Sequence, residues 1–185
     1  MSSLRKIVCF AVLLAVAGCG FQPLYSASGA PDAVSQDRLT RGLADVFVAE
    51  IPTRYGQILR RRVIDSISPQ GSPEHPRFLL EISLPEPREE QQGIRSDNIA
   101  TRTTLTYTAR YTLKNYADNK VIMTDKTSAM GSYNIVDSPY ATQVAARALK
   151  ERLVGIVGGD ISLRLAAYFR SHPRLSETPD AKEAE

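Results

Sequence analysis

The stretch TRTTLTYTARYTLKNY, from Thr101 to Tyr116, decides the predicted fold. Its odd positions from 105 to 113 carry Leu, Tyr or Ala, and its even positions from 102 to 114 carry Thr, Arg or Lys. This period of two is typical of a β-strand with one buried and one solvated face. Residues 117–120 read as a hairpin turn and residues 121–133 as the returning strand. The sequence therefore predicts a long antiparallel hairpin.

Four further segments complete the predicted domain: strands over 46–51 and 78–84, and helices over 55–67 and 140–170. The helices are predicted because their apolar side chains recur near a period of 3.6. Gly158 and Gly159 favour a kink or a break in the second helix, since each glycine costs about 1 kcal/mol relative to alanine there. This order predicts an α+β domain with two helices packed on one face of a roughly four-stranded, mainly antiparallel sheet.

Residues 1–18 have the pattern of a secretory signal peptide. Arg5 and Lys6 precede a run from Ile7 to Ala17 that is entirely apolar, and this run is too short to span a hydrocarbon core of about 30 Å. Small residues then precede Cys19, and this arrangement resembles a bacterial lipobox, in which the cysteine thiol receives a diacylglyceryl group. The alternatives are an ordinary signal peptide with an incidental cysteine, or an N-terminal membrane anchor.

Cleavage before Cys19 would change the composition of the mature chain. The full sequence has 23 Lys and Arg against 20 Asp and Glu, a formal charge of +3. Loss of Arg5 and Lys6 leaves 21 − 20 = +1, so the basic excess nearly disappears. Cys9 leaves with the signal peptide and Cys19 carries lipid, so we expect no disulfide and no thiol chemistry. Acylation of the new amine, as by palmitate, would give the multiple chains that stable anchoring requires.

The predicted organisation is a signal peptide over 1–18, a lipidated N-terminus and tether over 19–40, a single domain over 41–172, and a disordered acidic tail over 173–185. No hydrolase, nucleotide-binding or zinc-protease motif is found in the sequence. His75 and His172 each precede a proline in a loop or tail, which is a poor setting for a general base or a metal ligand. We therefore predict a non-enzymatic protein without cofactor or metal. A hydrolase that uses one of these histidines is an alternative.

The polar face of the 101–116 strand is the candidate binding surface. Arg102, Arg110 and Lys114 point the same way in a regular strand, and Arg95 lies just upstream. Such side chains suit phosphate or carboxylate ligands, and nucleic acid is not expected beyond the cytoplasm. An equally good interpretation is structural, because threonine favours strands and a one-sided sheet must present polar groups to water. Residues 60–62, all arginine, form a competing patch or a solvated helix face.

The string GCGFQPLY, from Gly18 to Tyr25, closely resembles the start of mature LPS-assembly lipoproteins of the LptE family, particularly the alphaproteobacterial type. The likeness continues more loosely through the threonine-rich strand, the turn at Asn134–Ala141 and the helix end at Leu165–Phe169. The resemblance implies two helices on a four-stranded sheet. It also implies a lipid-anchored protein at the periplasmic face of the outer membrane, and Gly20, where an aspartate often retains lipoproteins in the inner membrane, favours that location.

The function implied by the resemblance is membrane biogenesis through lipopolysaccharide transport. Members of the family plug the β-barrel LptD, and the two proteins together deliver lipopolysaccharide to the outer leaflet. They also bind lipopolysaccharide through basic residues near a sheet edge, and sequence position and charge select Arg95, Arg102, Arg110 and Lys114 as the candidates. A free periplasmic lipid carrier, which would bind its ligand without a barrel partner, is the alternative function.

Overall fold

The computed structural model describes residues 32–94 and 100–176. Several predicted features lie outside the described residues: the signal peptide, the expected lipidation site at Cys19, the Gly18–Tyr25 string, Arg95 and the segment 177–185. A compact unit begins at Val34, and the fold below is the fold of that unit.

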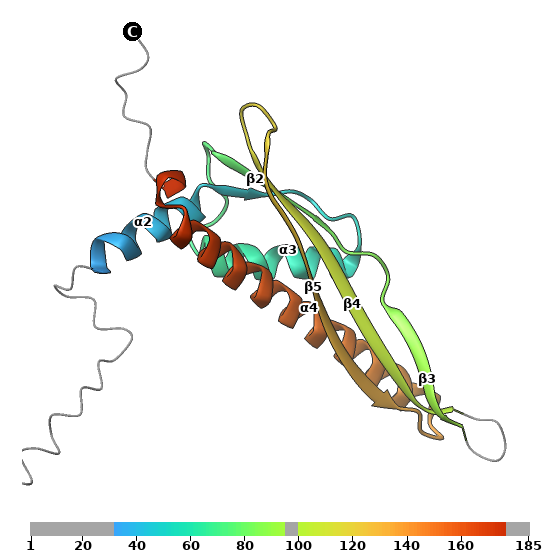
Figure 1. The fold of residues 1–185 in the computed structure, drawn as a ribbon. Helices are drawn as coiled ribbons and strands as arrows, with labels where there is room; N and C mark the ends of the chain where they lie inside the picture. Colours follow the sequence, from blue (N-terminus) through green and yellow to red (C-terminus); the bar gives the residue numbers. More distant parts are fainter. Residues whose placement is uncertain (1–31, 95–99, 177–185) are drawn as a thin grey trace, which may run out of the picture. The chain divides into compact units, whose positions relative to one another are not determined.

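The predicted period-two stretch forms the central strand, β4 (Ala100–Asn115). Its apolar residues are almost completely buried: Leu105, Tyr107, Ala109, Tyr111 and Leu113. The alternate residues face away from the core, as the pleat of a strand requires. Figure 1 shows β4 running along most of the length of the sheet. The strand and the orientation of its apolar face are both confirmed.

Four other strands are arranged around β4: β1 (Val46–Val48), β2 (Phe78–Ser83), β3 (Arg88–Ile94) and β5 (Val121–Asn134). β5 pairs antiparallel with β4 along one edge. β2 and β3 share the other edge, β2 opposite residues 110–115 and β3 opposite residues 100–106, and β1 extends β2 in parallel. The predicted α+β class is confirmed, with a mixed, mainly antiparallel sheet of five strands.

β3 is the strand that the sequence does not reveal. Its residues, REEQQGI, are mostly polar on both faces, so they carry no period-two pattern that would indicate a strand. The strand forms because β4 offers its backbone along residues 100–106, beyond the end of β2. Its existence therefore depends on tertiary hydrogen bonding rather than on an intrinsic hydrophobic pattern.

The first predicted helix is α3 (Arg54–Ile67). It begins where the hydroxyl of Thr53 accepts a hydrogen bond from the backbone N–H of Gly56 at 2.9 Å, the usual way to satisfy an exposed helix start. Its buried positions recur at helical spacing: Gly56, Leu59, Val63 and Ile67. This face packs toward the sheet, and burial of a leucine of this kind stabilises a fold by about 2 kcal/mol.

The second predicted helix is α4 (Pro139–Ser171), which is continuous through Gly158 and Gly159. The break or kink considered from the sequence does not form. The reason lies at the helix crossing, where a Cβ on Gly158 would lie 3.0 Å from Cγ of Arg62 and 3.3 Å from Cδ1 of Leu59. Gly158 thus allows α3 to approach α4 closely, and the packing between the two helices compensates for the low helix propensity of glycine.

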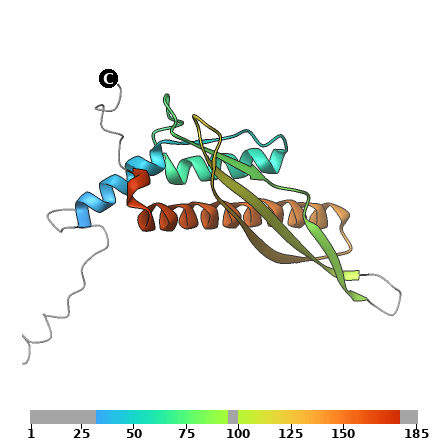
Figure 2. The same cartoon turned by 45° about the horizontal axis from the view of Figure 1, so that its top comes forward.

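Both helices lie on the same side of the sheet, as Figures 1 and 2 show from two directions. Completely buried side chains from α3, α4 and β4 meet in the space between: Leu59, Val63, Leu105, Leu113, Leu153, Val157, Ile161 and Leu165. No helix of residues 32–94 or 100–176 covers the opposite face of β4. Among the described residues, no helix combines the length and the apolar character needed to cross a membrane.

Two short elements occur in segments predicted to lack regular structure. α2 (Asp32–Ala44) covers part of the predicted tether and buries Leu39 in the core. η1 (Pro173–Ser176), a 3-10 turn after α4, occupies the start of the predicted tail and places Leu175 against the core. α2 contributes Leu39 and Leu43 to the core and η1 contributes Leu175, too few apolar residues for a clear helical period in either sequence.

The two neighbouring glycines of α4 allow a matched test of the helix crossing. We expect Gly158→Val to lower the free energy of unfolding by about 1–3 kcal/mol, because the larger side chain meets α3. Gly159→Ala is expected to raise it by about 1 kcal/mol, because nothing lies within 4 Å of that position and alanine favours a helix. Urea unfolding followed by circular dichroism measures both. Equal effects at the two positions would contradict the crossing.

Candidate functional site

The predicted basic residues of β4 that are described lie on the helix-free face of the sheet. Arg102 and Arg110 are exposed, whereas Lys114 is partly covered. With a rise of about 3.4 Å per residue, Arg102 and Arg110 lie about 27 Å apart along the strand, and Arg110 and Lys114 about 14 Å apart. The structure therefore brings them to one face but not into one pocket.

Lys114 is neutralised within the sheet. Its Nζ lies 2.6 Å from Oε2 of Glu81, a β2 residue on the same face. The lysine side chain is only 23% exposed, so the pair is well formed for a surface ion pair, although such pairs stabilise a fold by about 1 kcal/mol at most. Of the predicted residues described, Lys114 is thus the one whose charge is already compensated.

Arg110 lies in the most basic part of this face. Its partner on β5 is Lys126, which is also exposed, and its partner on β2 is Ser83. Directly opposed residues of an antiparallel pair have Cβ atoms about 5 Å apart, so two like charges face each other here. Lys126 was missed because the sequence was interpreted along β4 alone. The hairpin register, with the turn at Asn119 in the left-handed region (φ 56°), could have revealed it.

Arg102 lies near the other end of β4, opposite Gln92 of β3 and Asn134 of β5. Beside it the hydroxyl of Thr101 donates a hydrogen bond to the carbonyl of Gly93 at 2.8 Å. Within the described residues Arg102 makes no ion pair. Its guanidinium is therefore available to a ligand from this end of the sheet.

The three arginines at 60–62, the competing basic patch, make different contacts. Nε of Arg60 donates a hydrogen bond to the carbonyl of Val48 at 3.0 Å, which joins α3 to β1. The stem of Arg62 packs at the Gly158 crossing. Arg61 is exposed on the solvated side of the helix. The three arginines thus serve different purposes and do not present one concentrated charge.

A network of ion pairs and hydrogen bonds connects α4 to the β4–β5 hairpin. Arg164 on α4 lies 3.0 Å from a carboxylate oxygen of Asp125 on β5 and 3.1 Å from one of Asp160 on its own helix. The hydroxyl of Tyr111 donates to Asp125 at 3.2 Å, and the hydroxyl of Thr127 donates to Asp160. Each acidic group therefore has more than one partner, as a stable network near a protein surface requires.

The network shifts the protonation equilibria of its members. The backbone N–H of Lys126 and the Arg164 side chain hold the pKa of Asp125 below its ordinary value. Hydrogen bonds to Asp125 and Asp160 raise the pKa of Arg164, and burial with the neighbouring carboxylate raises the pKa of Tyr111. All three shifts favour the protonation states in which Arg164 and Tyr111 bind Asp125, so the network is structural in character.

A second buried tyrosine has no such partner. The hydroxyl of Tyr107 makes no hydrogen bond among the described residues, and burial together with Glu86 and Tyr55 raises its pKa to about 12.

His75 is exposed in a loop, and His172 stacks on Tyr168 with ring centroids 4.2 Å apart. In the described ranges, 32–94 and 100–176, His, Cys, Asp and Glu form no group of three that could hold a metal.

The fold resembles solved structures of small bacterial lipoproteins. One is a protein from Caulobacter crescentus CB15 assigned as a lipoprotein, with 21% identity, a TM-score of 0.59, and coverage of 72% of this chain and 96% of that one. Another is uncharacterized lipoprotein B from Nitrosomonas europaea, with 12% identity, a TM-score of 0.54, and coverage of 70% and 84%. No protein-family model matches the sequence, and a search of the curated proteins finds no match. At these identities the similarity establishes the fold alone.

The pKa shift of Asp125 predicts an acid-sensitive contact between α4 and β5. Below the ordinary aspartate pKa of about 3.9 the unfolded chain binds a proton that the folded chain still excludes, so stability falls as the pH drops through the folded value. We expect Asp125→Asn to reduce this acid-dependent loss in chemical unfolding measured from pH 7 to pH 3. Asp65→Asn, an exposed change on α3, is the control. An unchanged acid dependence in the Asp125 variant would contradict the network.

Proposed function

We propose that this chain is the lipoprotein subunit of a lipopolysaccharide export translocon. Cys19 would anchor it at the periplasmic face of the outer membrane, and the domain would plug and help assemble an LptD-type β-barrel. Two findings support the proposal: the Gly18–Tyr25 string resembles the LptE family, and the fold is one found in small bacterial lipoproteins. In this role the protein binds and positions, and it carries out no reaction.

The helix-free face of the sheet is the observation that carries this proposal. Along β4 it presents threonine at 104, 106, 108 and 112, and β5 adds Thr124, Ser128 and Ser132 on the same side. Hydroxyl groups both donate and accept hydrogen bonds, so this face suits the polar interior of a transmembrane barrel. A solvated sheet face needs polar groups too, but a long face rich in hydroxyls offers many adaptable contacts to a polar wall.

The basic positions on this face add a means of holding the cargo. Arg110 and Lys126 face each other across the β4–β5 pair, and Arg102 stands alone near the other end. Guanidinium groups make paired, charge-assisted hydrogen bonds with phosphate, and lipopolysaccharide carries phosphate on its lipid portion. These residues therefore form a discontinuous track of cations that could guide such a molecule along the strand.

Co-purification from solubilised outer membranes tests the role of plug. We expect the full chain to be isolated in an equimolar complex with a large β-barrel, and depletion to reduce surface lipopolysaccharide and leave the barrel misassembled. A free lipid carrier predicts a ligand complex without the barrel. Normal surface lipopolysaccharide after depletion would refute the translocon role.

The basic track gives a second prediction with an internal control. We expect Arg102→Gln combined with Arg110→Gln to weaken binding of purified lipopolysaccharide about tenfold, which corresponds to about 1.4 kcal/mol. Lys114→Gln should change it little, because Glu81 already compensates that charge. Binding of labelled lipopolysaccharide to the full chain in detergent measures both. If Lys114→Gln has the larger effect, the assignment of the track is wrong.

A further inference from the structure

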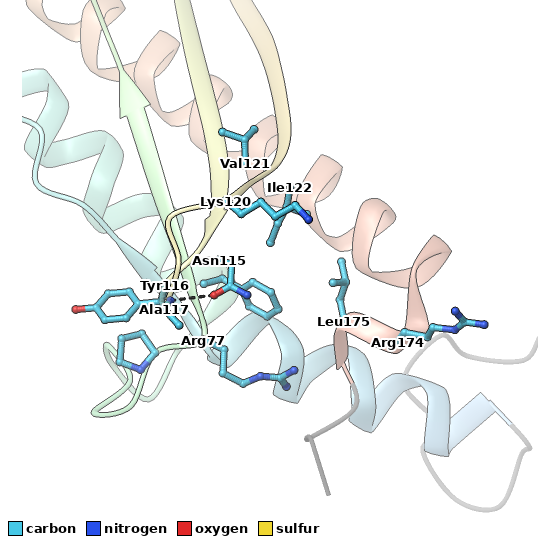
Figure 3. Close-up of a pocket in the computed structure, with 11 residues that line it drawn as sticks. Arg77, Asn115, Tyr116, Ala117, Lys120, Val121, Ile122, Arg174 and Leu175 are labelled. Carbon is cyan, nitrogen blue, oxygen red and sulfur yellow. Dashed lines mark hydrogen bonds between the residues drawn. The ribbon is translucent and has the colours of Figure 1, made fainter. Parts of the chain in front are cut away.

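A pocket of about 540 Å³ lies at the turn end of the β4–β5 hairpin. It is lined by the start of β2, by the hairpin turn with the end of β4 and the start of β5, and by the η1 turn, so three segments that are distant in sequence meet there. Figure 3 shows the residues that line it, with Arg174 and Tyr116 at opposite sides of its rim. The volume is within the range of small-molecule sites, about 300–1,000 Å³. None of the basic residues predicted from the sequence lines it.

Three cationic side chains line this pocket: Arg77, Lys120 and Arg174. Arg77 shares its charge with Asp45, with nitrogen and oxygen 3.5 Å apart. Lys120 and Arg174 are exposed and make no ion pair among the described residues. The three cations come from three different segments and lie at the rim of the pocket.

The rest of the lining is apolar. Phe78 is buried behind the pocket, with Ile122 and Leu175 partly buried against the core. Tyr116 and Val121 are 47% and 55% exposed, which leaves a large apolar surface open to solvent beside the charges. A free inorganic anion would use only the cations, and a purely apolar ligand would leave them without a partner. The lining therefore matches a molecule that has both an anionic head and an apolar chain.

The hairpin turn holds this lining in place. The side chain of Asn115 accepts a hydrogen bond from the N–H of Ala117 at 2.9 Å, as Figure 3 shows, and the carboxylate of Asp118 accepts one from the N–H of Lys120 at 3.0 Å. The N–H of Asn115 also donates to the carbonyl of Lys120 at 2.9 Å. Residues 115–120 are thus fixed before any ligand arrives, which lowers the ordering cost of binding.

We propose that this pocket binds one molecule of an anionic phospholipid, with the phosphate at the cationic rim that carries Lys120 and Arg174 and the start of an acyl chain against Val121 and Ile122. The site lies at the opposite end of β4 from Arg102. It goes beyond the proposed export role, since it requires neither the barrel nor lipopolysaccharide. Its ligand would be an ordinary component of the bilayer.

Photocrosslinking of the full chain in bilayer discs tests this site. Val121 is replaced by p-benzoylphenylalanine, and the discs contain phosphatidylcholine with tritium-labelled phosphatidylglycerol. We expect a labelled adduct, reduced about fivefold by either Lys120→Gln or Arg174→Gln, as removal of one cation near an anionic lipid predicts. Arg61→Gln, an exposed arginine on α3, is the matched charge control and should leave the adduct unchanged.

The probe at Leu163, an exposed apolar residue of α4, controls for non-specific contact with lipid. Equal labelling from positions 121 and 163, or labelling that does not respond to the Lys120 and Arg174 variants, would overturn the proposal. Equal adducts with labelled phosphatidylcholine would also overturn it, because the anionic head would then play no part. Adding lipopolysaccharide to the discs provides one further outcome: its replacement of phosphatidylglycerol in the adduct would assign the pocket to the export cargo instead. Loss of the barrel complex leaves these readouts unaffected, so the two proposals fail separately.

Discussion

The burial of one face of β4 is the constraint on which the rest of the domain depends. The strand is too long to be covered by a single short element, and α3 and α4 together supply the apolar cover. Its two edges are satisfied by β5 on one side and by β2 and β3 in succession on the other. A shift of β4 by one residue would exchange its buried and exposed faces, so this register fixes the whole sheet.

The same constraint separates the supporting side of the molecule from the side available for binding. Helices on one face leave the other face free, and the polar residues of β4 must then lie there. The Arg164 network adds to this separation, because it joins the C-terminal half of α4 to β5 through Asp125 without using any residue of the helix-free face. Changes in the basic track can therefore be made without disturbing the core.

Elements with their own hydrophobic period could be predicted from the sequence, and elements defined by their neighbours could not. β2, β4, α3 and α4 each carry such a pattern and form where expected, and α4 is unbroken at Gly158 and Gly159. β5 was predicted from the turn that precedes it. β3 has no such pattern and exists because β4 presents an unpaired edge to it. Gly158 was interpreted as a weakness of the helix, whereas its role at the crossing with Leu59 depends on a contact between segments about a hundred residues apart. Lys126 was missed for a related reason, because it lies opposite Arg110 only in the register of the folded hairpin.

On the helix-free face, some charges are compensated within the fold and others are not. At Lys114 the sheet supplies a carboxylate, Glu81, on the neighbouring strand. At Arg110 the corresponding neighbours are Ser83 and Lys126, so a like charge stands where a compensating one could have been placed. Directly opposed like charges destabilise a strand pair, and nothing in the fold requires them at this position. An external anion would remove that repulsion, which is why the Arg110–Lys126 pair, rather than Lys114, is the stronger candidate for contact with a phosphate-bearing ligand.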